Sequence, residues 1–235
     1  MAKCNPLRGI GWKQILRFAL FLFMSPVALF VAAGRLNWVM GWVCTGVSLG
    51  SAVVSRVIAA RRNPELLAER GRALEAADVQ GWDRLLLVLV GLVGPLATSI
   101  VAGLDQRFGW PPQVPLALQL VALTLMILGS LLATWAMVEN KFFSAVVRIQ
   151  KDRGQTVVTT GPYRFVRHPG YAGGLIAYLA MPFMLDALWM LIPALVIVTG
   201  IIVRTSLEDK TLQEGLDGYE DYAQRVRYRL LPGVW

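Results

Sequence analysis

The sequence predicts an all-α membrane protein with about six transmembrane helices. Of its 235 residues, 56% are hydrophobic and only 16% are charged, and the mean hydropathy is +0.54. A soluble domain is rarely so apolar, and the chain is long enough for several membrane crossings. Its lysines and arginines also segregate to one side of the apolar segments. These observations predict a single membrane domain over residues 1–235.

The predicted spans follow from the length of each apolar segment, since a bilayer core needs about 20 apolar residues in a helix. Four segments are long enough, at residues 15–33, 38–60, 85–103 and 116–138. Residues 171–185 and 187–203 are shorter and are separated only by Asp186. We expect this pair to form a tight helical hairpin. Residues 15–33 are longer than the apolar part of a signal peptide, and a second span follows closely, so we expect a span there.

The basic residues predict the orientation, because lysine and arginine favour cytoplasmic loops. With six spans, all of the 23 lysines and arginines except Arg35 and Arg107 fall on one side. We therefore expect both termini and the loop before the fifth span to be cytoplasmic. The membrane would be the inner or plasma membrane, or the endoplasmic reticulum in a eukaryote.

The net charge of +8 follows from this bias and from contact with anionic lipids, so we expect no nucleic-acid partner. The two cysteines, Cys4 and Cys44, offer neither a disulfide framework nor a metal-ligand spacing, so we expect no metal.

The connecting segments carry local signals. Residues 65–77 mix both charge signs and predict a short amphipathic surface helix. Residues 156–160 are β-branched and are followed by Gly161-Pro162, which predicts an extended connector. Pro169 suits the first turn of a helix. Residues 219–226 place tyrosines at helical spacing, which predicts a short helix across the cytoplasmic end of the spans. The tyrosines would serve equally well as anchors at the membrane–water interface.

Polar chemistry concentrates in residues 161–174, which contain the only histidine, His168. Four polar side chains share its turn: Tyr163, Arg164, Arg167 and Tyr171. The backbone N–H groups of Gly170 and Tyr171 would open the next helix and suit a carboxylate or phosphate. A histidine that only caps a helix or meets lipid headgroups is the alternative. The density of polar groups favours a ligand site.

A second polar segment begins where the last span leaves the membrane. Arg204 and Glu208 stand four residues apart and share a helix face, and Glu208 and Asp209 form an acidic pair. A buried carboxylate near a bilayer is commonly functional. An ordinary interfacial ion pair is the alternative.

Three stretches combine into a recognisable pattern. They are Gly161-Pro-Tyr-Arg-Phe-Val-Arg-His-Pro-Gly-Tyr-Ala-Gly173, then Arg204 with Glu208-Asp209, and then the tail from Gly218-Tyr219 through Tyr222 and Arg225-Val226 to Pro232. This combination resembles the isoprenylcysteine carboxyl methyltransferase family. The resemblance makes residues 116–235 the catalytic half and leaves the spans in residues 1–110 without a clear role. The family's paired glutamates stand here as Glu208-Asp209, and this shortening makes Glu208 the better candidate and leaves a role for Asp209 in doubt.

The resemblance implies a methyltransferase that uses S-adenosyl-L-methionine from the cytoplasm and a lipophilic acceptor from the membrane. It implies that the cofactor site is made by the loop before the fifth helix and the C-terminal tail. The cofactor-binding candidates are His168, Gly170, Tyr171, Tyr163 and Glu208, with Arg204 fixing the Glu208 carboxylate. The candidates for orienting the acceptor are Arg167 first, and then Asn140 and Arg164.

The acceptor class stays open. Methyl transfer from a sulfonium is an in-line displacement, and a carboxylate acceptor needs no strong base. An amine or thiol would need a base such as His168 or Glu208. Carboxyl O-methylation of an isoprenylcysteine-type substrate is the leading hypothesis, and a phospholipid amine or a small thiol is the alternative. A sterol or polyprenol reductase using NADPH has a similar loop and tail but usually more spans. A non-catalytic scaffold is the third hypothesis.

Overall fold

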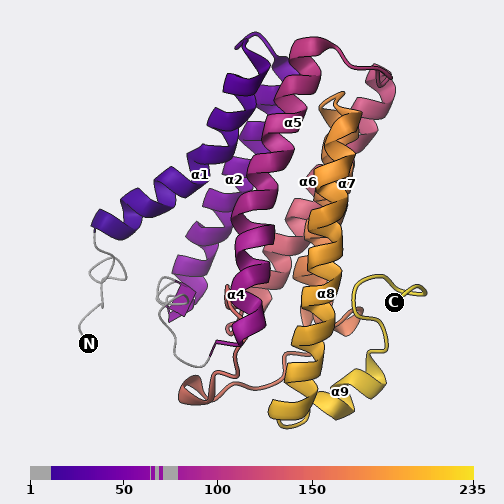
Figure 1. Cartoon of the computed structure of the whole chain (residues 1–235). Coiled ribbons are helices and arrows are strands. Elements are labelled where there is room, and N and C mark those ends of the chain that lie inside the picture. Colours follow the sequence, from indigo (N-terminus) through magenta and orange to yellow (C-terminus); the bar gives the residue numbers. More distant parts are fainter. Residues whose placement is uncertain (1–11, 64, 67–68, 71–78) are drawn as a thin grey trace.

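The computed structural model describes residues 12–63, 65–66, 69–70 and 79–235, and all regular secondary structure in these residues is helical. The main rods run side by side in a bundle (Figure 1). In chain order the helices are α1 (Trp12–Ala33), α2 (Val39–Arg62), α4 (Gly81–Val88), η2 (Leu89–Val93), α5 (Gly94–Phe108), α6 (Leu116–Glu139), α7 (Pro169–Met184), α8 (Leu191–Gly215) and α9 (Tyr219–Arg225). The predicted all-α class is confirmed for the described residues.

Within the described residues, four stretches are long and apolar enough to cross a membrane: α2, the continuous rod Gly81–Phe108, α6, and α8 with the short turn before it (Leu188–Gly215). The apolar part of α1, Ala19–Ala33, is shorter, and α7 has 16 residues. All six predicted segments are helical near their predicted positions. The count of six spans and the sides of the loops stay predictions. The predicted surface helix over residues 65–77 falls largely outside the described residues.

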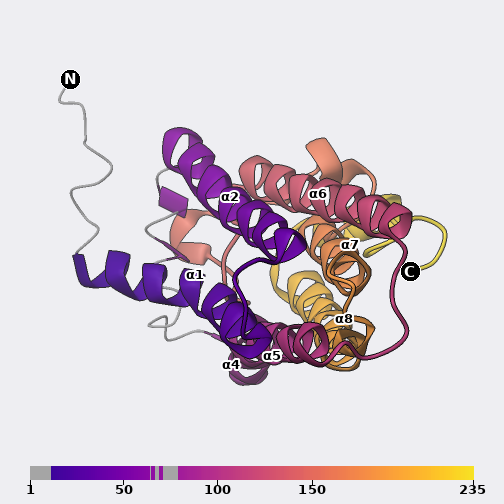
Figure 2. The ribbon, with the colours of Figure 1, turned by 90° about the horizontal axis from the view of Figure 1, so that it is seen from above.

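Helices α6 and α7 cross at two glycines. A Cβ atom on Gly173 would lie 2.4 Å from the Gly129 carbonyl oxygen, and one on Gly129 would lie 2.6 Å from the Gly173 carbonyl oxygen. Only glycine allows backbones this close, a common way for apolar helices to associate. The short α7 is thereby fixed along α6, as Figure 2 shows.

The rod from Gly81 to Phe108 contains a π turn at Leu89–Val93, just before Pro95. A proline inside a helix lacks an N–H and clashes with the preceding turn, and a π turn accommodates that disruption. At the same place, a Cβ atom on Gly94 would lie 2.4 Å from Ile197 of α8. This close packing aligns the rod with α8, so that the first turn of α4 lies beside the end of α8.

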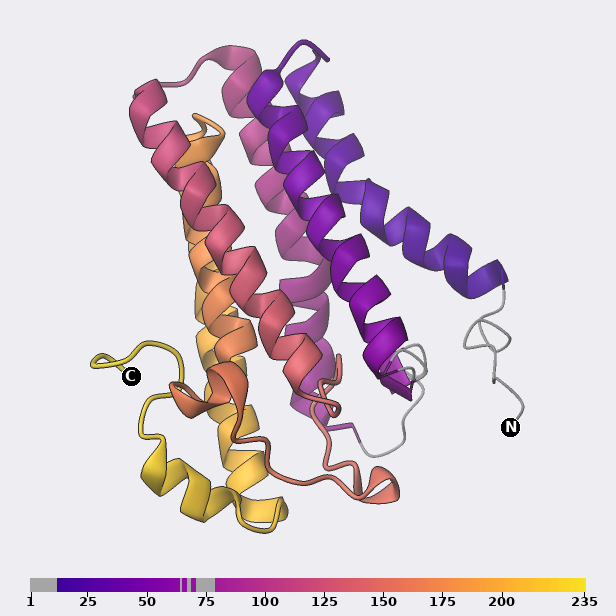
Figure 3. The same ribbon diagram turned by 180° about the vertical axis from the view of Figure 1, so that it is seen from behind.

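Helices α7 and α8 form the predicted hairpin. Its turn is closed by Asp186, which has a φ of +53° and accepts a hydrogen bond from the Val114 backbone N–H. Gln106 donates to the Leu185 and Asp186 carbonyls at 3.1 and 3.0 Å. Because the two helices are antiparallel, the start of α7 and the end of α8 meet at the opposite end of the bundle. Residues 140–168, α9 and the start of α4 gather there too (Figure 3), and we call it the polar end.

Candidate functional site

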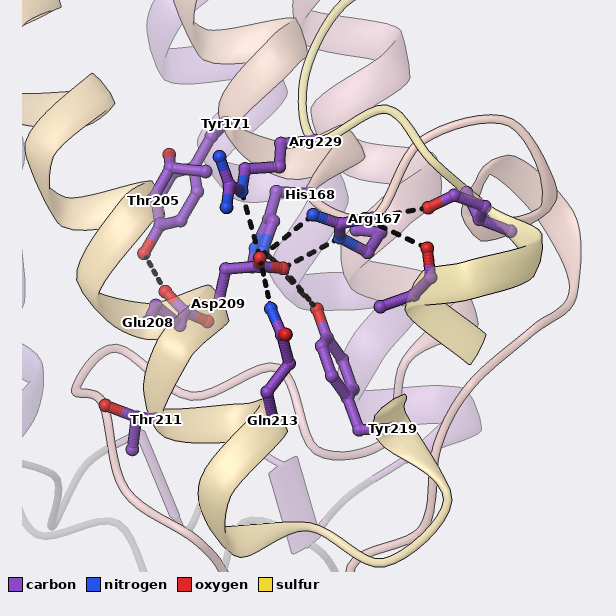
Figure 4. A network of polar contacts seen from close by, with 12 residues as sticks. Arg167, His168, Tyr171, Thr205, Glu208, Asp209, Thr211, Gln213, Tyr219 and Arg229 are labelled. Atoms are coloured by element: carbon purple, nitrogen blue, oxygen red, sulfur yellow. Dashed lines mark hydrogen bonds and ion pairs between the residues drawn. The ribbon is translucent and has the colours of Figure 1, made fainter. Parts of the chain in front are cut away.

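The site at the polar end is organised around one carboxylate, Asp209 of α8, which is fully buried. Arg167 binds it with two hydrogen bonds, from Nε to Oδ1 at 2.8 Å and from Nη2 to Oδ2 at 2.9 Å. Oδ2 also accepts from Arg229 Nε at 2.9 Å and Gln213 Nε2 at 2.8 Å, and Oδ1 accepts from the Tyr219 hydroxyl at 3.0 Å (Figure 4). These donors compensate the buried negative charge. Asp209, whose role the sequence left in doubt, therefore has a structural one: it joins the loop, α8, α9 and the tail.

His168 is held on the same carboxylate. Its Nε2 lies 3.2 Å from Asp209 Oδ1, and because an ionised carboxylate only accepts hydrogen bonds, Nε2 carries the proton. The His168 backbone N–H donates to the Arg229 carbonyl at 2.9 Å, and its ring stacks on Tyr171 with the ring centroids 5.9 Å apart. The imidazole is buried and fixed in orientation, and Nδ1 has no protein partner among the described residues.

The stacked Tyr171 connects His168 to Glu208. Its hydroxyl donates to Glu208 Oε2 at 2.6 Å. The other carboxylate oxygen, Oε1, accepts no hydrogen bond from the described part of the chain. Gly170 precedes Tyr171, and a Cβ atom there would lie 2.8 Å from the Phe143 ring. The structure thus brings four of the predicted cofactor residues together in one connected group.

We expected Arg204 to fix the Glu208 carboxylate, but its hydrogen bonds go to other acceptors. Its Nε donates to Asp83 Oδ1 at 2.7 Å, and its Nη2 donates to Asp83 Oδ2 at 3.2 Å and to the Ala145 carbonyl at 2.7 Å. Asp83, fully buried in the first turn of α4, also accepts from the Val147 N–H at 2.7 Å. The expected pairing with Glu208 is wrong because a carboxylate far away in sequence takes these donors. The Arg204 guanidinium still lies 5.7 Å from the centre of the Tyr171 ring.

Arg167 uses all three guanidinium nitrogens in hydrogen bonds within the protein. Besides its two bonds to Asp209, Nη1 donates to the carbonyls of Ala223, Val226 and Arg227 at 3.3, 2.9 and 3.1 Å. Its side chain is 7% exposed. These contacts hold α9 and the following residues on the loop, and within the described residues they leave only one N–H of Arg167, on Nη2, without an acceptor.

The other two acceptor candidates lie apart from this network. Arg164 is exposed, with its guanidinium 6.0 Å from the centre of the Phe165 ring. Asn140 ends α6, where its Oδ1 accepts from the Phe142 N–H and its Nδ2 donates to the Tyr163 hydroxyl at 3.3 Å. Asn140 therefore holds the loop rather than facing Tyr171 or Glu208.

Tyr163 and the tyrosines of α9 are internal. The Tyr163 hydroxyl donates to the Ala136 carbonyl at 3.3 Å, and the Tyr222 hydroxyl donates to the Tyr163 carbonyl at 2.6 Å. Burial raises the pKa of Tyr163, Tyr219 and Tyr222, so these phenols stay protonated at neutral pH. Tyr219 and Tyr222 are buried contacts of the network, and the alternative that they anchor the chain to the interface is wrong.

The sequence of this region matches known proteins. A profile of the phospholipid methyltransferase family matches residues 118–217, which contain α6, α7, α8 and most of the site. A probable protein-S-isoprenylcysteine O-methyltransferase of Oryza sativa subsp. japonica is 33% identical over 109 residues, which are 45% of this chain and 57% of that protein. Protein-S-isoprenylcysteine O-methyltransferase B of Arabidopsis thaliana is 31% identical over 107 residues, which are 44% and 54% of the two chains.

Over its C-terminal half, the chain is therefore similar to protein-S-isoprenylcysteine O-methyltransferases and to the phospholipid methyltransferase family. The chain spans a little over half the length of these relatives: the matched residues make up 57% of the Oryza protein and 54% of the Arabidopsis protein. In this chain, the acidic pair of α8 divides its contacts: Glu208 faces Tyr171, and Asp209 faces Arg167 and His168. Asp83 lies outside the residues that the family profile matches, and it was not among the site residues predicted from the sequence. The one sequence feature that could have indicated its role is that a carboxylate stands just before an apolar span.

Proposed function

We propose that this chain is a methyltransferase that uses S-adenosyl-L-methionine and acts on a lipophilic acceptor at the membrane. The observation that carries the proposal is the convergence of His168, Tyr171 and Glu208, all within the family match, at the end of an apolar helical bundle. We propose one membrane domain with residues 116–235 as its catalytic half. The basic bias of the sequence supports a cytoplasmic site and cytoplasmic termini.

The described residues fit this cofactor. S-adenosyl-L-methionine carries two positive groups, an ammonium and a sulfonium, as well as a carboxylate. Glu208 offers one carboxylate oxygen that has no donor among the described residues, which suits a positive group. The first turn of α7, with the N–H groups of Gly170 and Tyr171, suits a carboxylate. When bound, the cofactor supplies an electrophilic methyl group.

The residues of the chain then have three tasks: to align donor and acceptor, to hold the charges apart, and to exclude water. Alignment falls to the stacked His168 and Tyr171, whose positions are fixed by Asp209 and Glu208. Arg167 holds the tail that closes the network, so we propose that it positions the site rather than binds the acceptor. A carboxylate acceptor is already ionised at neutral pH, and its methylation requires no base.

We therefore propose carboxyl O-methylation of an isoprenylcysteine-type acceptor, which the names of the similar plant proteins support. N-methylation of a phospholipid amine is the second candidate, and the name of the matching family profile favours it.

The test follows a labelled methyl group from S-adenosyl-L-methionine into a membrane-lipid extract and into S-farnesyl-N-acetylcysteine, with the products identified by mass. A methyl ester supports the first candidate, and a methylated phospholipid amine supports the second. Tight NADPH binding with no response to S-adenosyl-L-methionine would refute both.

A matched pair of variants tests the cofactor site. Glu208→Gln removes the charge that faces the cofactor, so its Kd for S-adenosyl-L-methionine rises about 10-fold or more, the value of one charge-assisted hydrogen bond. The control is Glu214→Gln on the same helix, because Glu214 is exposed and pairs only with Lys210 at 3.7 Å. Equal Kd values for the two variants would contradict the assignment of Glu208.

A further inference from the structure

Arg70 is a partly buried arginine of the connector between α2 and α4, and most of its hydrogen-bonding capacity is unused. Its one hydrogen bond runs from Nη1 to the Phe143 carbonyl at 3.3 Å. A guanidinium has five N–H groups. Arg167 donates five hydrogen bonds to protein acceptors and Arg204 donates three. Within the described part of the chain, Arg70 therefore keeps four N–H groups without an acceptor.

Arg70 lies close to the candidate site through a single aromatic ring. Its guanidinium carbon is 5.7 Å from the centre of the Phe143 ring, and that ring packs directly on Gly170 in the first turn of α7. Arg70 also lies within electrostatic range of Tyr171. A connector from the N-terminal half of the chain thus reaches the turn that holds His168 and Tyr171.

Two positive charges, those of Arg56 and Arg204, act on Arg70. Burial, together with the positive charges of Arg56 and Arg204, lowers the pKa of Arg70 to about 10, so it remains a cation at neutral pH. The carboxylates of the adjacent Glu69 and of Asp83, the partner of Arg204, are already paired: Glu69 with Arg148 at 3.0 Å, and Asp83 with Arg204 at 2.7 Å. A partly buried cation without a counter-ion is unfavourable, and an anionic ligand would relieve that cost.

We propose that Arg70 binds the carboxylate of the lipophilic acceptor and so selects an anionic acceptor over an amine. This inference rests on the proposed methyltransferase function. The site then has a negative end at Glu208 for the cationic methyl donor and a positive end at Arg70 for the acceptor. The first turn of α7 connects the two ends, because the Tyr171 hydroxyl donates to Glu208 and the neighbouring Gly170 packs on the Phe143 ring that contacts Arg70.

The proposed step balances without a proton transfer. The carboxylate oxygen forms the new bond to the methyl carbon, and the sulfonium–methyl bond breaks with its electron pair going to sulfur. The carboxylate becomes a neutral ester and the sulfonium a neutral thioether. The ester no longer attracts the Arg70 cation, so the same residue that captures the acceptor favours release of the product.

The test uses the full-length protein in nanodiscs of neutral lipid, with S-farnesyl-N-acetylcysteine as the acceptor and its neutral carboxamide as a binding probe. For Arg70→Gln we expect the acceptor KM to rise about 10-fold or more, with the Kd for S-adenosyl-L-methionine unchanged. The preference for binding the acid over the carboxamide should fall by a similar factor. Arg70→Lys keeps the charge and should recover part of both effects. Arg62→Gln is the control, since Arg62 is an exposed arginine in the last turn of α2.

The possible outcomes distinguish a failure of the Arg70 role from a failure of the proposed methyltransferase function. If methyl transfer occurs and Arg70→Gln leaves the acceptor KM and the acid preference unchanged, the role of Arg70 is refuted while the proposed function stands. If the wild-type protein does not bind S-adenosyl-L-methionine but keeps an Arg70-dependent preference for the acid, the proposed function fails and the anion site stands. If nanodiscs with anionic phospholipid abolish the acid preference, Arg70 binds a lipid headgroup and the acceptor assignment is refuted.

Discussion

Replacing Asp209 with asparagine tests whether the buried carboxylate organises the site. The variant keeps the size of the side chain and one carbonyl oxygen, but it removes the negative charge that faces Arg167 and Arg229. Arg167 is buried, so its uncompensated charge dominates the cost, whereas the Arg229 side chain is 32% exposed and contributes less. Breaking a buried ion pair from one side costs about 3–5 kcal/mol, and we expect a loss of unfolding free energy in that range.

The assay is unfolding of the purified protein in mixed micelles by titration with a denaturing detergent, followed by tryptophan fluorescence. Asp217→Asn is the matched control, because Asp217 is exposed in the turn that follows α8. An exposed substitution of this kind changes the free energy of unfolding by about 0.5 kcal/mol or less. The Kd for S-adenosyl-L-methionine should also rise in Asp209→Asn, because the Nε2 atom of His168 loses its charged partner.

Equal stability of Asp209→Asn and Asp217→Asn would refute the argument that the carboxylate holds the loop, α9 and the tail together. A large loss of stability with unchanged cofactor affinity would show instead that the network supports the fold and does not position His168.

Three further predictions concern other parts of the polar end and the helix crossing. Asp83→Asn leaves Arg204 without its charged partner and should lower the free energy of unfolding by about 3–5 kcal/mol. The double variant Asp83→Leu/Arg204→Met leaves no unpaired charge and should lower it by less in the same assay. Equal losses for the two variants would contradict this prediction. Gly173→Ala places a Cβ atom 2.4 Å from the Gly129 carbonyl oxygen, so we expect it to lower the midpoint of thermal unfolding. Gly174→Ala is the control, because a Cβ atom there would have no described atom within 4 Å. Equal midpoints for the two variants would contradict the close crossing of α6 and α7. Burial and the Asp209 charge raise the pKa of Tyr219, so its contribution to stability is present below its ordinary pKa of about 10 and is lost as the pH rises further. Thermal midpoints measured from pH 8 to 11.5 should therefore fall less steeply for Tyr219→Phe than for the wild type, and parallel curves would refute the assignment.

The positions of the helices could be predicted because they depend on local pattern. Apolar length located every segment, and Pro169 located the start of α7, where it occupies the first turn. The grouping of His168, Tyr171 and Glu208 could be anticipated because the hairpin returns the chain to the same end. Each of these features is encoded by residues close together in the sequence.

The ion pairs could not be predicted in the same way. Arg204 and Asp83 are 121 positions apart, and the spacing of Arg204 from Glu208 suggested a different partner. A buried arginine takes the carboxylate that packing places beside it, and packing across the bundle leaves no periodic signal. For the same reason nothing in the sequence marked Asp209 as the centre of the network, although it lies next to the expected Glu208.

The order of residues around Asp209 has a consequence for biosynthesis. Arg167 and His168 precede this carboxylate in the chain, but Gln213, Tyr219 and Arg229 follow it. On the ribosome, Asp209 emerges before three of its five partners, and its charge stays incompletely compensated until residue 229 has been made. The helices can associate earlier, since their contacts lie upstream. The polar end is therefore the last part of the molecule to assemble, and a chain ending before α9 would hold a helical bundle without a finished site.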